Sequence, residues 1–288
     1  MSPFKARFTL NIYLMLRHVM ADKKHNLQLD EAAALVENAI EHSFSLATNR
    51  VSMSNDAARA AHGFSLTEKR LFTAAISQID SRPNRMHAGA KTLHVSAQQY
   101  ADTFNIDPKI AYRDLKRAAD NIFERYISVR DGKKVTRIRW IDKATYHDGE
   151  GWVAITFSDS VMPHLYELTH RFTSYKLSRV SALRSLYAWR LMEYLYSFLG
   201  DPMNEPGKMV VDLEDLRFAL EVPASYRFTD IKRRVLESSC KEIEKSDSII
   251  IDWIPIKRGK KVKKIEFTWR PSVQAILNFE VGEKLKNT

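Results

Sequence analysis

Basic side chains are concentrated between Ser225 and Lys264, and their order is the clearest chemical signal in the chain. The first group follows a helical pattern and consists of Arg227, Lys232, Arg233 and Arg234, with the neutral hydroxyl of Thr229 among them. The second group surrounds Gly259 and consists of Lys257, Arg258, Lys260, Lys261, Lys263 and Lys264. Guanidinium and ammonium groups bind phosphate oxygens, and arginine also pairs with the edge of guanine. These residue types in this order predict contact with a nucleic acid.

A helix followed by two strands would hold these groups in place. Thr229 is the expected N-cap, and Asp230 would lie in the first turn, where the helix dipole favours an anion. The positions with the spacing of a buried helical face are Ile231, Val235, Leu236, Ser239, Cys240 and Ile243. The runs Ile249–Ile254 and Lys264–Trp269 predict strands, with Gly259 between them able to turn the chain. This order is typical of a winged helix, whose helix enters the major groove while its hairpin follows a phosphate backbone.

A solvated surface is the alternative interpretation of these charges. The run KRGKKVKK, taken alone, fits a solvated face as well as it fits a phosphate contact. The helix and the run belong to one supersecondary unit, however, and their combination favours nucleic-acid contact.

The segment from Phe64 to Phe157 shows the same succession of elements. Ser65 with Glu68, and Ser96 with Gln99, have the spacing of capping boxes. The expected helices are 66–79, 97–104 and 108–123, the last beginning at Asp107–Pro108 with Ile110 on its apolar face. The expected strands are Thr92–Val95, Tyr126–Arg130, Val135–Asp142 and Trp152–Phe157, with a hairpin turn at Asp131–Lys134.

The second half repeats this unit. A long helix over 181–199 precedes a strand at Lys208–Val211 and a helix capped by Asp212. Ser96, Gln99, Tyr100, Phe104 and Ile106 correspond to Asp212, Asp215, Leu216, Leu220 and Val222 at one constant offset. Such a repeated pattern predicts an α+β protein with two tandem winged-helix domains joined by a long helix. The expected division is an N-terminal extension over 1–50, helical or partly ordered, a first winged helix over 51–178 and a second over 179–288.

The composition restricts the classes of partner. The chain has 288 residues and a net charge of +10, which favours a polyanion: nucleic acid first, an anionic membrane surface second. Its single cysteine, Cys240, excludes an internal disulfide and any cysteine-cluster metal site. No apolar run approaches the roughly 20 residues of a membrane span, so we expect a cytoplasmic protein with no membrane partner.

The motifs of several enzyme classes are absent. The nearest match to a phosphate-binding loop, Gly200 to Lys208, has the wrong spacing and places Met209 where a hydroxyl is needed. Asp212, Glu214 and Asp215 are better explained as first-turn charges than as metal ligands, and no H-x-H or H-E-x-x-H occurs. We therefore expect no catalytic residues, no metal and no cofactor. The aromatic set Tyr187, Trp189, Tyr194, Tyr196 and Phe198 is expected to pack in the core.

Four stretches carry a resemblance to a known family. They are NDAARAAHGFSLTEKR (55–70), RFTSYKL (171–177), SLYAWRLMEYLY (185–196) and YRFTDIKRRVL (226–236). From about Val51 to Arg270 the chain resembles the iteron-binding replication initiators of theta-replicating bacterial plasmids, a family that includes the F-plasmid initiator. Met192 departs from the aromatic residue common in the third stretch. The first 50 residues lie outside the resemblance.

The resemblance implies partners and a division of labour. Family members bind direct repeats of double-stranded DNA at the plasmid origin as monomers, promote strand opening and help to load the replicative helicase with the host initiator. As homodimers in equilibrium with the monomer they bind an operator inverted repeat and repress their own gene. The second winged helix is the main DNA reader, and the first contributes DNA contact and the dimer interface.

The first domain carries its own candidate DNA contacts. They are Lys109, Tyr112, Arg113, Lys116 and Arg117 on the helix, with Lys133 and Lys134 on the expected wing. Part of the helical set fits a solvated face or a dimer interface as well. Rival functions are a winged-helix transcription repressor without a replication role, an origin nickase or recombinase, and, more distantly, a membrane-surface protein.

Overall fold

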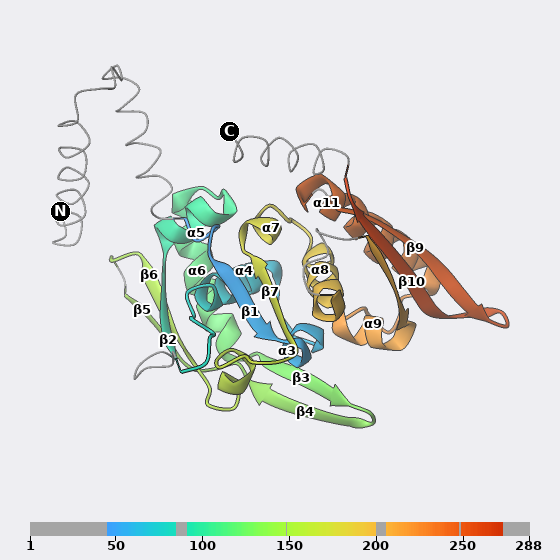
Figure 1. The fold of residues 1–288 in the computed structure, drawn as a ribbon. Helices are drawn as coiled ribbons and strands as arrows, with labels where there is room; N and C mark the ends of the chain where they lie inside the picture. Colours follow the sequence, from blue (N-terminus) through green and yellow to red (C-terminus); the bar gives the residue numbers. More distant parts are fainter. Residues whose placement is uncertain (1–44, 85–90, 148, 200–205, 248, 273–288) are drawn as a thin grey trace, which may run out of the picture. The chain divides into compact units, whose positions relative to one another are not determined.

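The fold was analysed in a computed structural model, which describes residues 45–84, 91–147, 149–199, 206–247 and 249–272 (Figure 1). These residues all belong to one compact unit, 44–288. The helices expected in the N-terminal extension lie outside the described residues.

The first winged helix is built around a three-stranded antiparallel sheet. Its elements are α4 (Leu66–Ile76), β2 (Thr92–Ser96), α5 (Ala97–Phe104), α6 (Pro108–Phe123), β5 (Ile141–His147) and β6 (Trp152–Phe157). The strand order is β2-β6-β5, so the last strand lies in the middle. Both predicted capping boxes are present, at Ser65 with Glu68 and at Ser96 with Gln99, and Asp107 caps α6. Local sequence signals therefore set where these helices begin.

The second winged helix has the same topology. Its elements are α8 (Leu186–Leu199), β8 (Gly207–Asp212), α9 (Leu213–Ala219), a helix formed by α10 (Phe228–Asp230), η2 (Ile231–Glu237) and α11 (Ser238–Asp247), β9 (Ile249–Arg258) and β10 (Lys261–Pro271). The strand order β8-β10-β9 again places the last strand in the middle. The internal repeat predicted from the sequence is confirmed.

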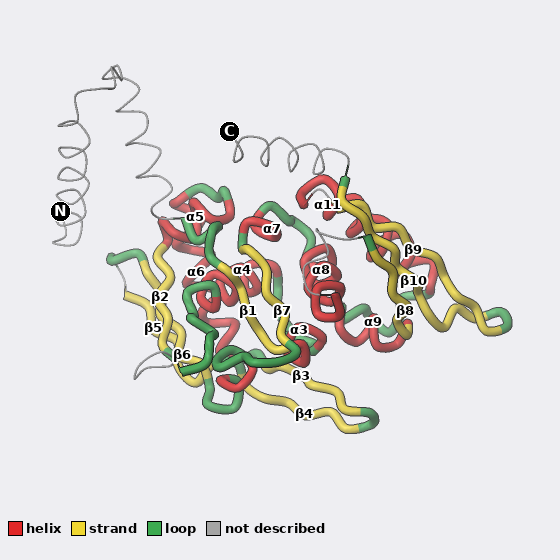
Figure 2. Tube along the Cα trace, in the orientation of Figure 1, coloured by secondary structure: helices red, strands yellow, loops and turns green. Residues whose placement is uncertain are grey.

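Several elements of the first half have no counterpart in the second. They are β1 (Arg50–Ser54) paired with β7 (Phe172–Lys176), α3 (Asn55–Arg59), the hairpin of β3 (Tyr126–Asp131) and β4 (Lys134–Arg139), η1 (Met162–His164) and α7 (Ser178–Ser181). The β3–β4 hairpin forms a sheet of its own, apart from β2-β6-β5 (Figure 2). We call it the inserted hairpin.

The predicted single strand Val135–Asp142 is wrong, because the chain changes sheets at Trp140. Strand β4 pairs with β3, whereas β5 pairs with β6. The Trp140 side chain is fully buried, lies 4.5 Å from the ring of Phe72, centroid to centroid, and donates its indole N–H to the carbonyl of His62 at 3.2 Å. Turning this large ring into the core breaks the strand.

The long helix before the second sheet begins at Leu186, five residues later than predicted. Its start is fixed by a carboxylate from another element: Glu242 of α11 accepts the backbone N–H groups of Arg184 at 2.5 Å and Ser185 at 3.1 Å. These two donors precede the first turn, where backbone N–H groups have no partner inside the helix. A tertiary contact, which no local pattern reveals, therefore sets the helix start.

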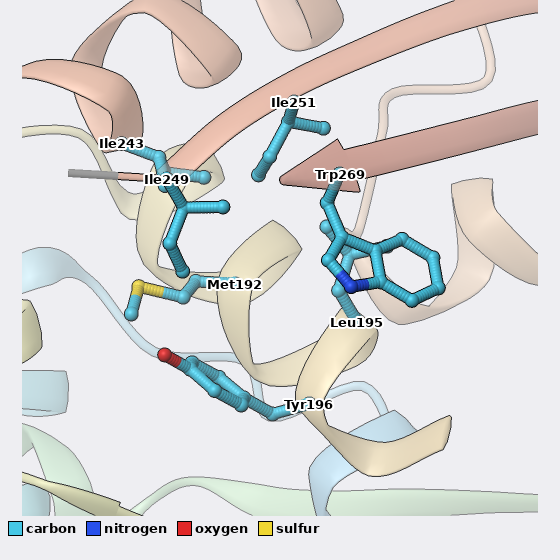
Figure 3. A pocket seen from close by; sticks show the side chains of 7 residues that line it. All are labelled: Met192, Leu195, Tyr196, Ile243, Ile249, Ile251 and Trp269. Carbon is cyan, nitrogen blue, oxygen red and sulfur yellow. The ribbon is translucent and has the colours of Figure 1, made fainter. Parts of the chain in front are cut away.

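One face of α8 completes the core of the second winged helix. Met192, Leu195 and Tyr196 converge on Ile243 of α11, Ile249 and Ile251 of β9, and Trp269 of β10 (Figure 3). The space left among these seven side chains is about 10 Å³, enough for at most one water molecule, so it is a packing gap and no ligand site.

Candidate nucleic-acid interface

The basic helix of the second domain spans 228–247, and its N-cap lies two residues earlier than predicted. The residue preceding its first turn is Arg227, whose backbone N–H donates to the carboxylate of Asp230 at 3.1 Å. Thr229, the expected N-cap, lies inside the helix and is exposed. The prediction of Thr229 as N-cap is therefore wrong, because Asp230 reaches back to cover the unpaired N–H group.

The apolar face of this helix is buried as predicted. Ile231, Val235, Ser239 and Ile243 recur every four residues and are buried. In a regular α-helix, positions 12 residues apart drift by about 120° around the axis. The segment Ile231–Glu237 is instead a π-helix, whose wider turns offset this drift and keep the face toward the core.

Burial of that face leaves the cations of the basic helix in solvent. Lys232, Arg233 and Arg234 are exposed. Lys232 lies 3.7 Å from Glu237, whereas no hydrogen bond or ion pair of the Arg233 side chain is found within the described part of the chain. Exposed ion pairs contribute little, so these charges stay available to an incoming phosphate or base.

The wing of the second domain is the β9–β10 hairpin, whose tip reaches past the third strand. Strand β8 pairs only with Lys264–Trp269, so the segment from Lys257 to Lys263 extends beyond the sheet (Figure 1). Gly259, with φ of +64°, supplies the turn. All six predicted wing cations are exposed, and none pairs with a carboxylate of the residues that the structure describes.

Helix α6 carries the candidate contacts of the first domain. Lys109, Arg113 and Arg117 are exposed, and Asp114 lies 3.7 Å from Arg113 and 3.3 Å from Arg117. Tyr112 and Lys116 are half-buried, and the Lys116 ammonium lies 4.5 Å from the ring centroid of Tyr146 on β5. Ile110, expected on the apolar face, is 42% exposed.

Lys133 and Lys134 are exposed, but they do not lie on the wing of the first domain. They lie at the tip of the inserted hairpin, where Asp131 pairs with Lys134. The strands that match the wing of the second domain are β5 and β6, and their turn includes Glu150, which accepts the indole N–H of Trp152 at 2.8 Å. The sequence placed a turn correctly but could not show which hairpin joins the sheet.

Two further cations of the inserted hairpin, Arg137 and Arg139, were not among the residues predicted from the sequence. The guanidinium of Arg137 lies 4.7 Å from the ring centroid of Tyr126. Arg139 donates to the backbone carbonyl of Phe123 at 2.6 Å, and its guanidinium lies 5.8 Å from the centroid of the Phe123 ring. The alternation of Arg137 and Arg139 with Ile138 and Trp140 was the sequence signal that both cations lie on one face of the strand.

Other residues noted in the sequence have structural roles. Cys240 is buried, and burial raises the pKa of its thiol to about 12, as expected of a core residue. Trp189, Tyr194 and Tyr196 are buried as predicted, but Phe198 is 45% exposed, with the guanidinium of Arg59 3.6 Å from its ring centroid.

The described residues contain no cluster of three metal-ligating side chains. None of the described helices is long and apolar enough to cross a membrane.

Comparison with known proteins adds named relatives. A replication initiation protein of Escherichia coli is 21% identical over 218 residues, which cover 74% of this chain and 67% of the relative. The PI protein of Escherichia coli is 22% identical over 238 residues, covering 70% of this chain and 76% of the relative. The crystal structure of the Pi initiator protein in complex with iteron DNA matches with a TM-score of 0.64 at 19% identity, over 77% of this chain and 97% of that one. This likeness supports the fold.

Two family models match successive parts of the chain. The model described as "Initiator Replication protein, WH1" covers residues 50–196, and "Initiator Rep protein, WH2" covers residues 212–269. The predicted resemblance and the predicted pair of winged helices are both confirmed. Two repeated winged helices with exposed cations and these two matches lead to one conclusion: the chain belongs to the family of initiator replication proteins, DNA-binding initiators of plasmid replication.

Proposed function

We propose that this protein initiates replication by binding direct repeats at a plasmid origin with both winged helices. The observation that carries the proposal is the repeated unit itself: α6 and the 228–247 helix occupy equivalent positions, and each exposes cations opposite a buried apolar face. The Pi initiator, crystallised with iteron DNA, shares this fold. Two such helices on one duplex would read a longer site than either alone.

The second domain supplies the main reader in this proposal. Its helix brings Arg227, Thr229, Lys232, Arg233 and Arg234 to the major groove. The wing brings Lys257, Arg258, Lys260, Lys261, Lys263 and Lys264 to the flanking phosphates. Arginine pairing with guanine is typically worth about 1–3 kcal/mol of discrimination, whereas phosphate contacts fix position and register.

The first domain takes the neighbouring groove. Lys109, Tyr112, Arg113, Lys116 and Arg117 lie along α6, and Lys133 and Lys134 extend from the inserted hairpin. Contact by two modules would allow the duplex to bend, and bending favours the opening of an adjacent A·T-rich segment. Helicase loading with the host initiator, and repression of its own gene by a homodimer, complete the proposed role in the cytoplasm.

We further propose that the protein acts by binding and cuts no DNA. Supercoiled origin DNA incubated with the protein and Mg²⁺ should remain supercoiled. The appearance of nicked circles that depend on the protein would favour the nickase alternative.

Footprinting of the purified protein on the origin region of its source replicon tests the main proposal. Regular protected blocks over direct repeats, with distorted strands beside them, are the expected result. A single protected inverted repeat at a promoter, with no protection at the origin, would leave the fold unchanged and assign the protein to transcriptional repression.

A further inference from the structure

We infer that Tyr226 is a positioning residue for sequence recognition, because it holds Arg234 in the pose from which that arginine reads a guanine. The inference rests on the proposed function and assigns a role to a side chain that itself touches no DNA. Its basis is a set of contacts that Arg234 makes and that its neighbour Arg233 does not.

Arg234 is held from two sides. Its Nη1 donates to the hydroxyl of Tyr226 at 3.4 Å, and its guanidinium lies 5.3 Å from the centroid of the Tyr226 ring. On the other side, its Nε lies 3.9 Å from a carboxylate oxygen of Asp230. The Arg234 side chain is nevertheless 52% exposed, so these contacts orient the group and leave it accessible.

The groups that hold Arg234 are themselves fixed. The second carboxylate oxygen of Asp230 accepts the backbone N–H of Arg227, which ties it to the start of the helix. The loop that carries Tyr226 is bound to α9 by Arg217, which donates to the carbonyls of Pro223 and Tyr226, each at 3.1 Å. A chain of contacts therefore runs from α9 through the loop to the exposed arginine.

The donors that remain on Arg234 match a guanine edge. An arginine has five N–H donors. One on Nη1 is directed to Tyr226, and Nε lies 3.9 Å from Asp230, a distance for charge attraction without a hydrogen bond. The second Nη1 donor and both Nη2 donors make no hydrogen bond within the described part of the chain. Guanine presents two acceptors, N7 and O6, in the major groove. A guanidinium fixed beforehand loses less conformational freedom on binding, so it discriminates better than a mobile one.

Arg233 provides the internal contrast. It is exposed in the same π-helical segment, and no polar partner of its side chain is found in the described stretch. Without such contacts its guanidinium is not oriented before binding, so a base contact made by Arg233 does not depend on Tyr226. Removal of the Tyr226 hydroxyl should therefore weaken the contact of Arg234 with its base and leave the contact of Arg233 with DNA unchanged.

The test uses the full-length chain and two duplex probes, one holding the repeat protected in the footprint and one of equal length lacking it. In Tyr226→Phe, which keeps the ring but loses the hydroxyl, the ratio of repeat to non-repeat affinity should fall by about threefold to tenfold. The salt dependence of binding should stay unchanged, because no phosphate contact is lost. Tyr126→Phe, in a tyrosine–arginine stack on the inserted hairpin, is the matched control and should leave the ratio unchanged.

A second measurement identifies the base. Guanines of the repeat are replaced one at a time by 7-deazaguanine, which lacks the N7 acceptor. One position should weaken binding of the unchanged protein, lose that effect in Arg234→Ala, and show a reduced effect in Tyr226→Phe. Arg234→Lys keeps the charge but lacks the rigid planar fork of the guanidinium and cannot be held by Tyr226 in the same way, so it should reduce the effect.

The outcomes separate this inference from the proposed function. If the unchanged protein does not prefer the repeat duplex, the proposed function fails and the inference fails with it. If it prefers the repeat but Tyr226→Phe lowers both affinities equally, or if the 7-deazaguanine effect persists in Arg234→Ala, only the inference is overturned. Thermal unfolding of each variant shows whether a loss reflects a damaged fold.

Discussion

At the residue scale, Arg190 binds three backbone carbonyl groups in addition to the carboxylate of Glu193. This fully buried side chain donates to the carbonyls of Ala58, Ala60 and Ala219, and its Nη1 lies 2.7 Å from Glu193. Removal of one partner from a buried ionic network leaves the others without hydrogen bonds, which is costly. Arg190 therefore joins α3, α8 and α9 through polar contacts inside an apolar core.

Replacement of Arg190 by methionine should lower the free energy of unfolding by about 3–5 kcal/mol. Replacement of Lys69, whose ammonium lies 2.8 Å from Glu193, should cost much less. The reason is that Glu193 keeps Arg190 and the hydroxyl of Tyr175, which donates to it at 2.5 Å, when Lys69 is lost. Urea unfolding of Arg190→Met and Lys69→Met measures both. Equal losses would show that Arg190's carbonyl contacts add no stability.

Lys69 should also make stability depend on pH. Burial lowers its pKa from 10.5 to about 8, in spite of the attraction of Glu193. Between these values the unfolded chain holds a proton that the folded chain has released, so stability rises with pH. Cys240, whose pKa is raised by burial, acts in the opposite direction above pH 9, so the window to examine is pH 8 to 9.

In this window the free energy of unfolding of the unchanged protein should rise relative to that of Lys69→Met. Urea unfolding at pH 8.0 and 9.0 for both proteins gives the difference, in which titrations common to both cancel. A difference that stays constant or falls would mean that Lys69 keeps its proton throughout.

Arg233→Ala addresses recognition at the same scale. It should weaken binding to the origin repeat by about tenfold or more and weaken binding to unrelated DNA much less, because a base contact is worth about 1–3 kcal/mol. Gel-shift titrations on both probes give the two affinities. An equal loss on both would place Arg233 on a phosphate.

At the scale of elements, the wing offers the cleanest electrostatic experiment. Neutralising Lys260 and Lys261 at the tip of the β9–β10 hairpin should flatten the slope of log affinity against log salt by roughly one to two, at about 0.9 per phosphate contact. The matched control neutralises Lys241 and Lys245, exposed cations on the half of the helix far from its leading end, and should leave the slope unchanged. A slope unaffected by the first pair would remove the wing from the interface.

The elements also show what a sequence can and cannot predict. The capping boxes at Ser65 and Ser96 were predictable because a cap involves residues three positions apart. The strand break at Trp140 and the late start of α8 were not, because each depends on a partner distant in the sequence. Likewise, the exposed cations followed from the buried face of their helix, but the pairing of Arg234 with Tyr226 depends on how a loop is held.

At the scale of the whole molecule, the N-terminal boundary can be tested by deletion. Leu46 is buried and its N–H donates to Thr103 at 2.8 Å, while Arg50 begins the strand that pairs with Lys176. Removal of residues 1–43 should therefore leave the melting temperature and repeat binding intact. Removal of 1–50 should lower the melting temperature, because it also removes Leu46 and the first residue of β1. Thermal unfolding and gel shifts of both truncations provide the check, and equal behaviour would show that residues 44–50 contribute nothing.

Helix α8 has a consequence for how such proteins can diversify. Its Glu193 contacts the first half of the chain and its Met192, Leu195 and Tyr196 contact the second, whereas Arg190 contacts both. A recombination event that joined the first half of one initiator to the second half of a distant cousin would mismatch one side of this helix wherever the crossover fell. New origin preferences would then be acquired by single substitutions among exposed cations. The two halves of each protein would be inherited together, because both must fit the same helix.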